Sequence, residues 1–197
     1  AVAEDLDIAA SKTGMLANAA IIRALATCID ECEIGELVVD PVMVATSGAR
    51  LLDADAERLM TERLLPRARL ATPNLPEAAV LAGLPADSDV AALADAILAS
   101  GCRAVLIKGG HGDSENIVDL LATPDGRREF RHRRIGRAPV HGTGCALSAA
   151  ITAHLARGAE LEEAVETAID WLQSLLARTW RPRKGPLGML NFSAGRG

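Results

Sequence analysis

The sequence predicts an α/β protein of three layers, with helices on both faces of a mostly parallel sheet. Short apolar segments alternate with longer stretches of helical spacing, which is the pattern of βαβ units. Two segments around the turn residues Pro124-Asp125-Gly126 predict an antiparallel hairpin at one edge of the sheet. We expect one domain over residues 1–197, because this length suffices for a single core.

The first half of the chain predicts three strands, each followed by a helix. Apolar residues over 8–12, the β-branched run 37–39 and the segment 69–72 are the strands, and Pro41 ends the second of them. Helical spacing of Ile, Leu and Met predicts helices over 18–29 and 53–65, the latter with Asp53 as N-cap. Residues 73–77 open the third helix, and residues 1–7 have the composition of the end of a helix.

The second half predicts a helix, a buried strand, the hairpin and two further helices. The helix over 90–100 stops at Gly101, and 104–107 is the clearest buried strand. The hairpin strands cover 116–122 and 127–133, and the basic segment 127–137 is interpreted as a solvated strand face. The last two helices cover 144–157 and 161–177, and Gly158 separates them.

Composition excludes several classes of protein. Aromatic residues are 2% of the chain, Tyr is absent and the formal net charge is −5, which is atypical of a nucleic-acid reader. The longest apolar run falls short of the roughly 18 residues that a membrane span needs. Four cysteines without a CxxC pair or zinc-like spacing indicate reduced thiols. We therefore expect a cytoplasmic protein that binds neither membrane nor nucleic acid.

Polar residues stand at the ends of the predicted strands. Lys12, Asp40, Asn74 and Lys108 each come directly after or at the end of an apolar segment. Ligands of parallel sheets bind beyond the carboxyl ends of the strands. We expect these four side chains to meet there.

A glycine-rich segment, His141-Gly142-Thr143-Gly144-Cys145, precedes an Ala-rich helix. The first-turn N–H groups and the helix dipole of such a segment favour an anion, and they are expected to lower the pKa of the Cys145 thiol. A lysine suits phosphate, and carboxylate and amide oxygens suit Mg²⁺. The set predicts phosphoryl transfer from a nucleotide, without a GxxxxGK[ST] loop.

Simpler interpretations of these residues remain open. The lysines are also compatible with a plain surface position, Asp40 with the start of a turn, and Met15 with the core. Asn74 is also a candidate N-cap, and Glu77 a first-turn charge beside the helix dipole. The remaining histidines and tryptophans are assigned to loops, surface or packing: His111 and His141 shape loops, His132 and His154 lie at the surface, and Trp171 and Trp180 pack.

Five blocks of sequence, in order along the chain, resemble one enzyme family. They are residues 12–16 (KTGML), 40–48 (DPVMVATSG), 72–78 (TPNLPEA), 107–111 (IKGGH) and 141–145 (HGTGC), and the closing 185–192 also fits. The blocks resemble the hydroxymethylpyrimidine/phosphomethylpyrimidine kinases of thiamine biosynthesis, within the ribokinase-like superfamily. The resemblance implies a ribokinase-like fold and a phosphotransferase, a homodimer, that uses ATP and Mg²⁺ to phosphorylate 4-amino-5-hydroxymethyl-2-methylpyrimidine and then its monophosphate.

The resemblance also implies roles for single residues. Gly142, Thr143 and Gly144 would form the anion hole, and Cys145 would stand where most ribokinase-like enzymes place an Asp base, either accepting a proton or only positioning the substrate. The other implied site residues are Lys108 and Asp40 at the nucleotide phosphates, Asn74 and Glu77 at Mg²⁺ through water and at ATP, and Met15 and Val42 at the pyrimidine.

The chain departs from the family at its start. Family members begin with a strand and a glycine-rich segment carrying an Asp, and nothing here matches them, so we expect an N-terminally incomplete kinase domain with an exposed sheet edge. Two alternatives stay open: a pyridoxal-type kinase of the same superfamily, and a nucleotide-binding remnant with weak catalysis.

Overall fold

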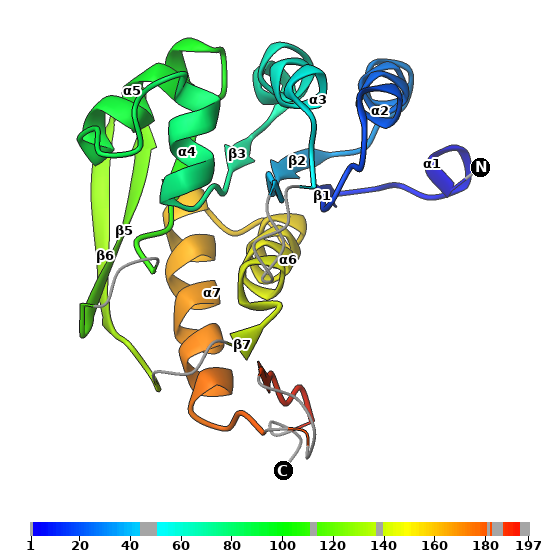
Figure 1. Cartoon of the computed structure of the whole chain (residues 1–197). Coiled ribbons are helices and arrows are strands. Elements are labelled where there is room, and N and C mark those ends of the chain that lie inside the picture. Colours follow the sequence, from blue (N-terminus) through cyan, green and yellow to red (C-terminus); the bar gives the residue numbers. More distant parts are fainter. Residues whose placement is uncertain are drawn as a thin grey trace.

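A central sheet with helices on both faces organises the chain, as the sequence predicts (Figure 1). The structure, a computed structural model, describes residues 2–43, 51–110, 114–136, 140–180, 182 and 187–193. Within these ranges no helix has the length and apolarity that crossing a membrane requires.

Six strands of the described chain form the main sheet, in the spatial order of the sequence. The strands are β1 (Ala10–Thr13), β2 (Glu36–Val39), β3 (Leu70–Ala71), β4 (Val105–Ile107), β5 (Asn116–Thr123) and β6 (Gly126–Arg133). The first four run parallel, and β5 and β6 add the predicted antiparallel hairpin at one edge. The carboxyl ends of the four parallel strands therefore meet on one side of the sheet.

A second, two-stranded parallel sheet lies at the start of the glycine-rich loop. It pairs β7 (Val140–His141) with β8 (Gly188–Met189), and neither strand was expected from the sequence. Each has only two residues, too few for a periodicity signal. The pairing ties the end of the described chain to the entrance of the following helix.

The helices divide between the two faces of the sheet (Figure 1). One face carries α2 (Ala19–Glu31), α3 (Ala54–Leu59), α4 (Leu75–Ala82) and α5 (Val90–Ala99), and the other carries α6 (Thr143–Ala156) and α7 (Leu161–Leu176). A short helix, α1 (Val2–Asp5), precedes β1.

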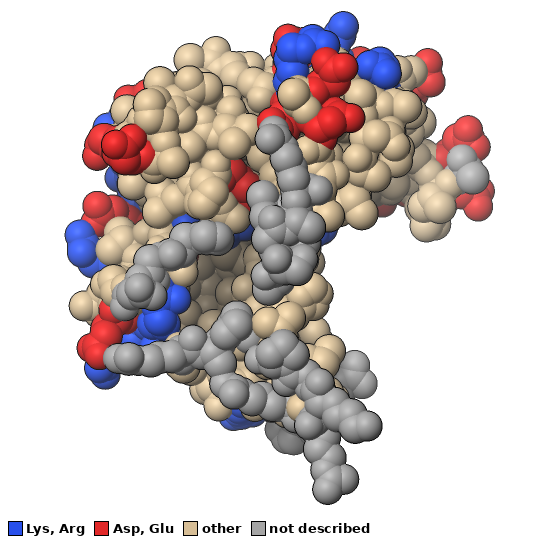
Figure 2. All heavy atoms as spheres, viewed as in Figure 1, with Lys and Arg blue, Asp and Glu red and all other residues tan. Residues whose placement is uncertain are grey.

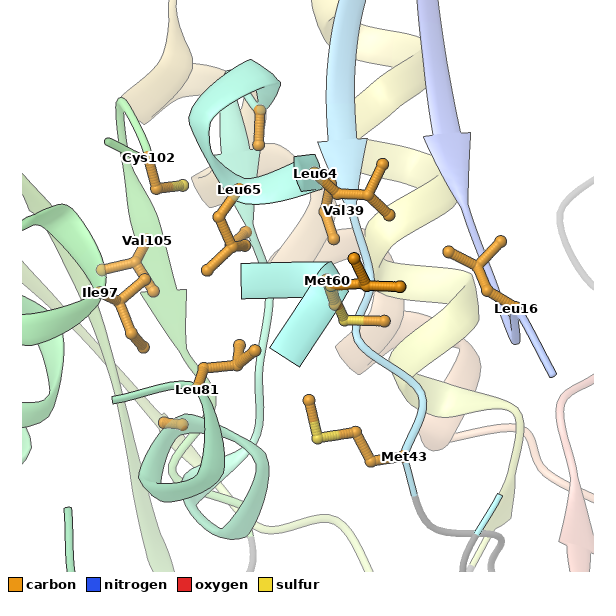
Figure 3. Packing of buried hydrophobic residues seen from close by; sticks show 14 of the residues in the cluster. Leu16, Val39, Met43, Met60, Leu64, Leu65, Leu81, Ile97, Cys102 and Val105 are labelled. Atoms are coloured by element: carbon orange, nitrogen blue, oxygen red, sulfur yellow. The ribbon is translucent and has the colours of Figure 1, made fainter. Parts of the chain in front are cut away.

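Alternate side chains of the strands fill two separate cores. Val39 and Val105 face α2–α5, and Figure 3 shows them with Met60 and Leu65 in that layer. Val38, the neighbour of Val39, packs with residues of α6 and α7 instead. Because side chains of a strand alternate between faces, a parallel sheet covered on both sides needs apolar residues in succession. That need explains the continuous apolar runs of the sequence.

The helix predicted over 53–65 begins as expected but changes geometry before its end. Asp53 is the N-cap, and its Oδ1 accepts the Ala56 N–H at 2.7 Å. After Leu59 the chain widens into a π-helical turn over Met60–Leu64, followed by a 3₁₀ turn over Leu65–Arg67. Pro66 has no N–H to donate and its ring crowds the preceding turn, so regular α-helix cannot continue through it.

The basic strand β6 is not a simple solvated face, so that prediction was wrong for one side of the strand. Arg128 donates to Glu162 at 3.0 Å and to Glu166 at 2.7 Å, both on α7, and its guanidinium lies 4.8 Å from the Phe130 ring centre. His132, expected at the surface, is mostly buried between two polar partners. Alternation along the strand turns every second residue toward α7.

Both tryptophans are more exposed than predicted. Trp171 retains 37% and Trp180 51% of its accessible surface. Trp171 makes a tilted ring contact with Phe192 at 6.2 Å, but the described chain leaves most of Trp180 uncovered.

Surface charge is mixed: Figure 2 shows acidic and basic side chains together over α3, where Arg58 pairs with Glu62 at 2.8 Å.

Two glycines with nearly the same backbone conformation provide a test of the β1–β2 connection. Gly35 has φ +64° and Gly83 has φ +63°, but a Cβ on Gly35 would lie 2.1 Å from the Ala9 carbonyl oxygen, whereas none of the described atoms lies within 4 Å at Gly83. We expect Gly83→Ala to lower the free energy of unfolding by about 1 kcal/mol, the cost of the left-handed backbone. Gly35→Ala should cost about 1–3 kcal/mol more, because backbone must shift. Urea denaturation of both variants measures the difference, and equal losses would contradict the close packing of Gly35 on the backbone of Ile8 and Ala9.

Candidate active site

A buried carboxylate, Asp40, stands at the carboxyl end of β2 and gathers polar side chains from neighbouring elements. It is 2% exposed. The Lys108 Nζ lies 3.5 Å from its Oδ1, and the Lys12 Nζ lies 3.6 Å from its Oδ2. The Thr72 hydroxyl donates to Oδ1 at 3.4 Å, and the Ser148 hydroxyl donates to Oδ2 at 3.0 Å. These five residues are the Asp40 cluster below.

The Asp40 cluster combines side chains from the carboxyl ends of the parallel strands with one from helix α6 on a face of the sheet. Lys12 belongs to β1, Lys108 follows β4, and Ser148 lies on α6, which packs directly against β1 and β2 (Figure 1). Lys12 also donates to the Ser148 hydroxyl at 3.2 Å. The expectation that strand-end polar residues meet is confirmed for Lys12, Asp40 and Lys108.

The charges of the Asp40 cluster do not cancel. Two ammonium groups share one carboxylate, so the cluster carries a net positive charge. The lysine side chains keep 23% and 15% of their surface exposed, while the Asp40 carboxylate keeps 3%. A positive, partly accessible surface over a buried anion suits a polyanionic ligand such as a nucleotide phosphate.

The glycine-rich loop lies beside Lys108. Gly142 is the N-cap of α6 with φ +81° and provides no side-chain cap to the first-turn N–H groups. A Cβ on Gly144 would lie 3.2 Å from the Lys108 Nζ. The predicted anion loop and the lysine ammonium thus face the same space, and a side chain at position 144 would crowd the lysine.

Cys145 has a higher pKa than we predicted, so the expectation of a lowered pKa was wrong. Its side chain reaches solvent, yet partial burial is the largest cause that raises the pKa of the thiol, and the negative charge of Asp40 raises it further. Lys12 and Lys108 act in the opposite direction but do not prevail. The resting thiol is therefore protonated at neutral pH.

Asn74 and Glu77 form a reciprocal capping box at the start of α4. The Asn74 Oδ1 accepts the Glu77 N–H at 2.9 Å, and the Glu77 Oε2 accepts the Asn74 N–H at 2.9 Å. The other Glu77 oxygen accepts the Met43 N–H at 3.4 Å. Burial raises the pKa of Glu77, against the effect of the Asn74 N–H and of Lys108. The capping interpretation of Asn74 is confirmed, and Glu77 lies in the first turn of α4 as its simpler interpretation has it, with the reciprocal capping bond in addition. The role of both residues at a metal remains a prediction.

Strands β3 and β4 bring Asn74 next to Lys108. The Lys108 N–H donates to the Pro73 carbonyl at 2.9 Å, and Asn74 and Lys108 form an isolated parallel bridge. The capping box and the Asp40 cluster are thus neighbours at the carboxyl ends of the parallel strands.

The two residues predicted to contact a pyrimidine lie on loops after β1 and β2. Met15 is 54% exposed, which excludes the core alternative, and its sulfur accepts the Ala17 N–H at 3.2 Å. Val42 is half-buried. Residues 44–48 of the second sequence block and His111 of the fourth lie outside the described residues.

Sequence reasoning missed Ser148 and Thr72, which are both fully buried. Ser148 follows Cys145 by three positions, so helical geometry places both on one face of α6. Thr72 precedes Asn74 by two positions and directly follows β3. These offsets were the only available signals, and serine and threonine are too common at such positions for them to stand out.

Comparison with known proteins gives a family and a fold. The family described as phosphomethylpyrimidine kinase matches residues 1–190. The chain is 42% identical over 180 residues to the hydroxymethylpyrimidine/phosphomethylpyrimidine kinase of Escherichia coli K12, covering 90% of this chain and 68% of that protein. The Bacillus subtilis 168 protein of the same name is 40% identical over 182 residues, covering 91% and 67%.

Solved structures of two pyridoxal kinases and of a phosphomethylpyrimidine kinase share the fold of this chain. An ADP complex of Bacillus subtilis pyridoxal kinase superposes with a TM-score of 0.85 at 34% identity, covering 94% of this chain and 70% of that one. A Staphylococcus aureus pyridoxal kinase with AMP-PCP and pyridoxal gives 0.84 at 31%, covering 93% and 66%. A phosphomethylpyrimidine kinase of Clostridium difficile 630 gives 0.72 at 34%, covering 87% and 70%.

Two substitutions of Glu77 separate its capping role from its charge. Glu77→Ala should lower the free energy of unfolding by about 1–3 kcal/mol, because it leaves the Asn74 N–H without its acceptor. Glu77→Gln keeps an oxygen for that N–H and removes the buried charge, so it should cost less. Chemical denaturation at neutral pH compares them, and a glutamine variant as unstable as the alanine variant would contradict the capping account.

Proposed function

The chain belongs to the phosphomethylpyrimidine kinase family, and from that premise we propose that it transfers a phosphoryl group from ATP to 4-amino-5-hydroxymethyl-2-methylpyrimidine and then to the monophosphate. Enzymes of this name are phosphotransferases. The observation that carries the proposal is the convergence of Lys12 and Lys108 on Asp40 beside the Gly142–Gly144 loop. We further propose a cytoplasmic homodimer whose residues 1–197 belong to one ribokinase-like kinase domain.

The nucleotide phosphates would lie between Lys108 and the first turn of α6. The ammonium group supplies a point charge, and the N–H groups of Gly142, Thr143 and Gly144 supply fixed dipoles. Asp40 holds the two lysines at its carboxylate. Because phosphoryl transfer needs charge stabilisation more than covalent chemistry, these groups would carry most of the catalysis. Complexes of the similar kinases with ADP and AMP-PCP support ATP as the donor.

Mg²⁺ fits the oxygen donors of this edge. The described residues hold no group of three or more acidic, His or Cys side chains arranged as a metal cage. Mg²⁺ bound to ATP needs none, because it keeps several waters and binds mainly through phosphates. Asp40 and Glu77 offer carboxylate oxygens, Asn74 an amide oxygen, and the ion would neutralise phosphate charge there. Glu77→Gln, which keeps the capping acceptor, is the variant in which a raised magnesium requirement reports this role.

Cys145 is proposed to accept the proton of the substrate hydroxyl, and Met15 and Val42 to contact the pyrimidine ring. A raised pKa makes the thiolate scarce at neutral pH but makes it a stronger base once formed. In a loose transition state the proton leaves late, so a scarce base is sufficient. The oxygen of the substrate hydroxyl would attack the γ-phosphorus while its proton passes to the Cys145 sulfur. The bond between the γ-phosphorus and the bridging oxygen would break, and ADP would leave with that oxygen.

Pyridoxal phosphorylation is the second candidate, because several of the similar structures are pyridoxal kinases. Steady-state assays with the hydroxymethylpyrimidine and with pyridoxal, at equal Mg-ATP, separate the two. We expect the higher kcat/KM for the pyrimidine, and a Lys108→Met variant should lose at least tenfold with either alcohol. ATP binding without turnover of either alcohol would contradict the kinase proposal and favour a nucleotide-binding remnant.

Cys145→Ser tests the proton acceptor. We expect turnover to fall at least tenfold, about 1.4 kcal/mol of transition-state stabilisation. The pH profile gives the sign: since the thiolate forms only as pH rises through a raised pKa, wild-type turnover should increase on the alkaline side of neutrality. The serine variant should lose that increase. An unchanged rate and profile would leave Cys145 a positioning group.

A further inference from the structure

Asp119 of β5 is a buried carboxylate that the proposed mechanism does not use. It is 4% exposed. Its Oδ1 accepts the Gly109 N–H at 2.8 Å, and its Oδ2 lies 3.0 Å from the His132 Nε2. Gly109 directly follows Lys108, so the carboxylate holds the backbone at the lysine of the candidate site.

His132 extends this contact to α7. Its Nδ1 lies 2.9 Å from the Gln173 Nε2. With the Gln173 amide nitrogen as donor, His132 accepts at Nδ1 and donates from Nε2 to Asp119. Every donor in the series then has an acceptor: Gln173 donates to His132, His132 to Asp119, and Gly109 to Asp119.

The backbone around Lys108 is held from both sides. A Cβ on Gly109 would lie 2.0 Å from the Val118 carbonyl oxygen, so only glycine permits this approach to β5. On the other side the Lys108 N–H donates to the Pro73 carbonyl at 2.9 Å. The lysine side chain leaves this clamped segment toward Asp40, with its Nζ 3.5 Å from the carboxylate.

We infer that Asp119, oriented by His132 and Gln173, is a positioning residue that sets the Lys108 ammonium for binding the nucleotide phosphates. The inference rests on the proposed role of Lys108. Stabilisation of the phosphate charge depends on preorganised geometry, so a small displacement of the Lys108 ammonium would weaken it. A purely structural role would lower stability but leave the phosphate contacts of the folded protein unchanged.

Binding of Mg-ATP and of adenosine, measured by titration calorimetry on folded protein, tests the inference. Asp119→Ala should weaken Mg-ATP binding about tenfold, about 1.4 kcal/mol, and leave adenosine binding unchanged. His132→Leu, which keeps Asp119 but removes its orienting donor, should give a smaller loss of the same kind and serves if the first variant does not fold. Asp125→Asn, an exposed carboxylate at the turn of the same hairpin, is the matched control and should bind both ligands normally.

A double-mutant cycle separates the inference from the proposed function. If Asp119 acts through Lys108, the Lys108→Met/Asp119→Ala variant should bind Mg-ATP no worse than Lys108→Met alone. Additive losses, or a folded Asp119→Ala variant with normal Mg-ATP affinity, would overturn the inference while leaving Lys108 in its role. Normal Mg-ATP binding by Lys108→Met would instead overturn the proposed role of Lys108, and the inference with it.

Discussion

The burial of the Asp40 carboxylate is the constraint on which the site depends. A charge that is 2% exposed must be compensated by partners, because the cost of desolvating it is large. The partners come from β1, from the ends of β3 and β4, and from α6. Compensating one anion therefore fixes how three strand ends and a helix approach one another. Two lysines lie against it, and their ammonium groups are what a phosphate would bind.

The Asp40 carboxylate also disfavours the thiolate form of Cys145. Asp40 attracts the lysines that would stabilise a Cys145 thiolate, but its own charge and the partial burial of Cys145 raise the pKa of the thiol. A protonated thiol is a poor nucleophile and resists oxidation. The arrangement therefore keeps a solvent-accessible cysteine unreactive at rest, and places it beside the loop where a substrate hydroxyl would lose its proton.

The sequence allows the layers, the alternation of strands and helices and the N-caps Asp53 and Asn74 to be predicted, because these depend on local pattern. It also places Lys12, Asp40, Asn74 and Lys108 correctly at strand ends, because parallel strands share an edge. Ser148 was missed because its contact with Asp40 joins residues 108 positions apart, and no local pattern encodes it. The sign of the Cys145 shift was missed for a related reason: the helix terminus is visible in sequence, whereas burial and the approach of Asp40 are not.

The hairpin illustrates how distant packing acts on the site. In sequence, β6 is an alternating basic strand without chemistry, and half of its side chains are indeed exposed. The other half packs on α7, and His132 among them donates to the carboxylate that accepts the Gly109 N–H. Lys108 directly follows the three-residue strand β4, and the Asn74–Lys108 bridge continues the pairing by one residue. Beyond the strand, the backbone is held by two contacts, the Lys108 N–H to Pro73 and the Gly109 N–H to Asp119. On the proposed roles of Lys108 and Asp119, the hairpin edge of the sheet would contribute to phosphate binding, although it carries none of the groups that would touch the nucleotide.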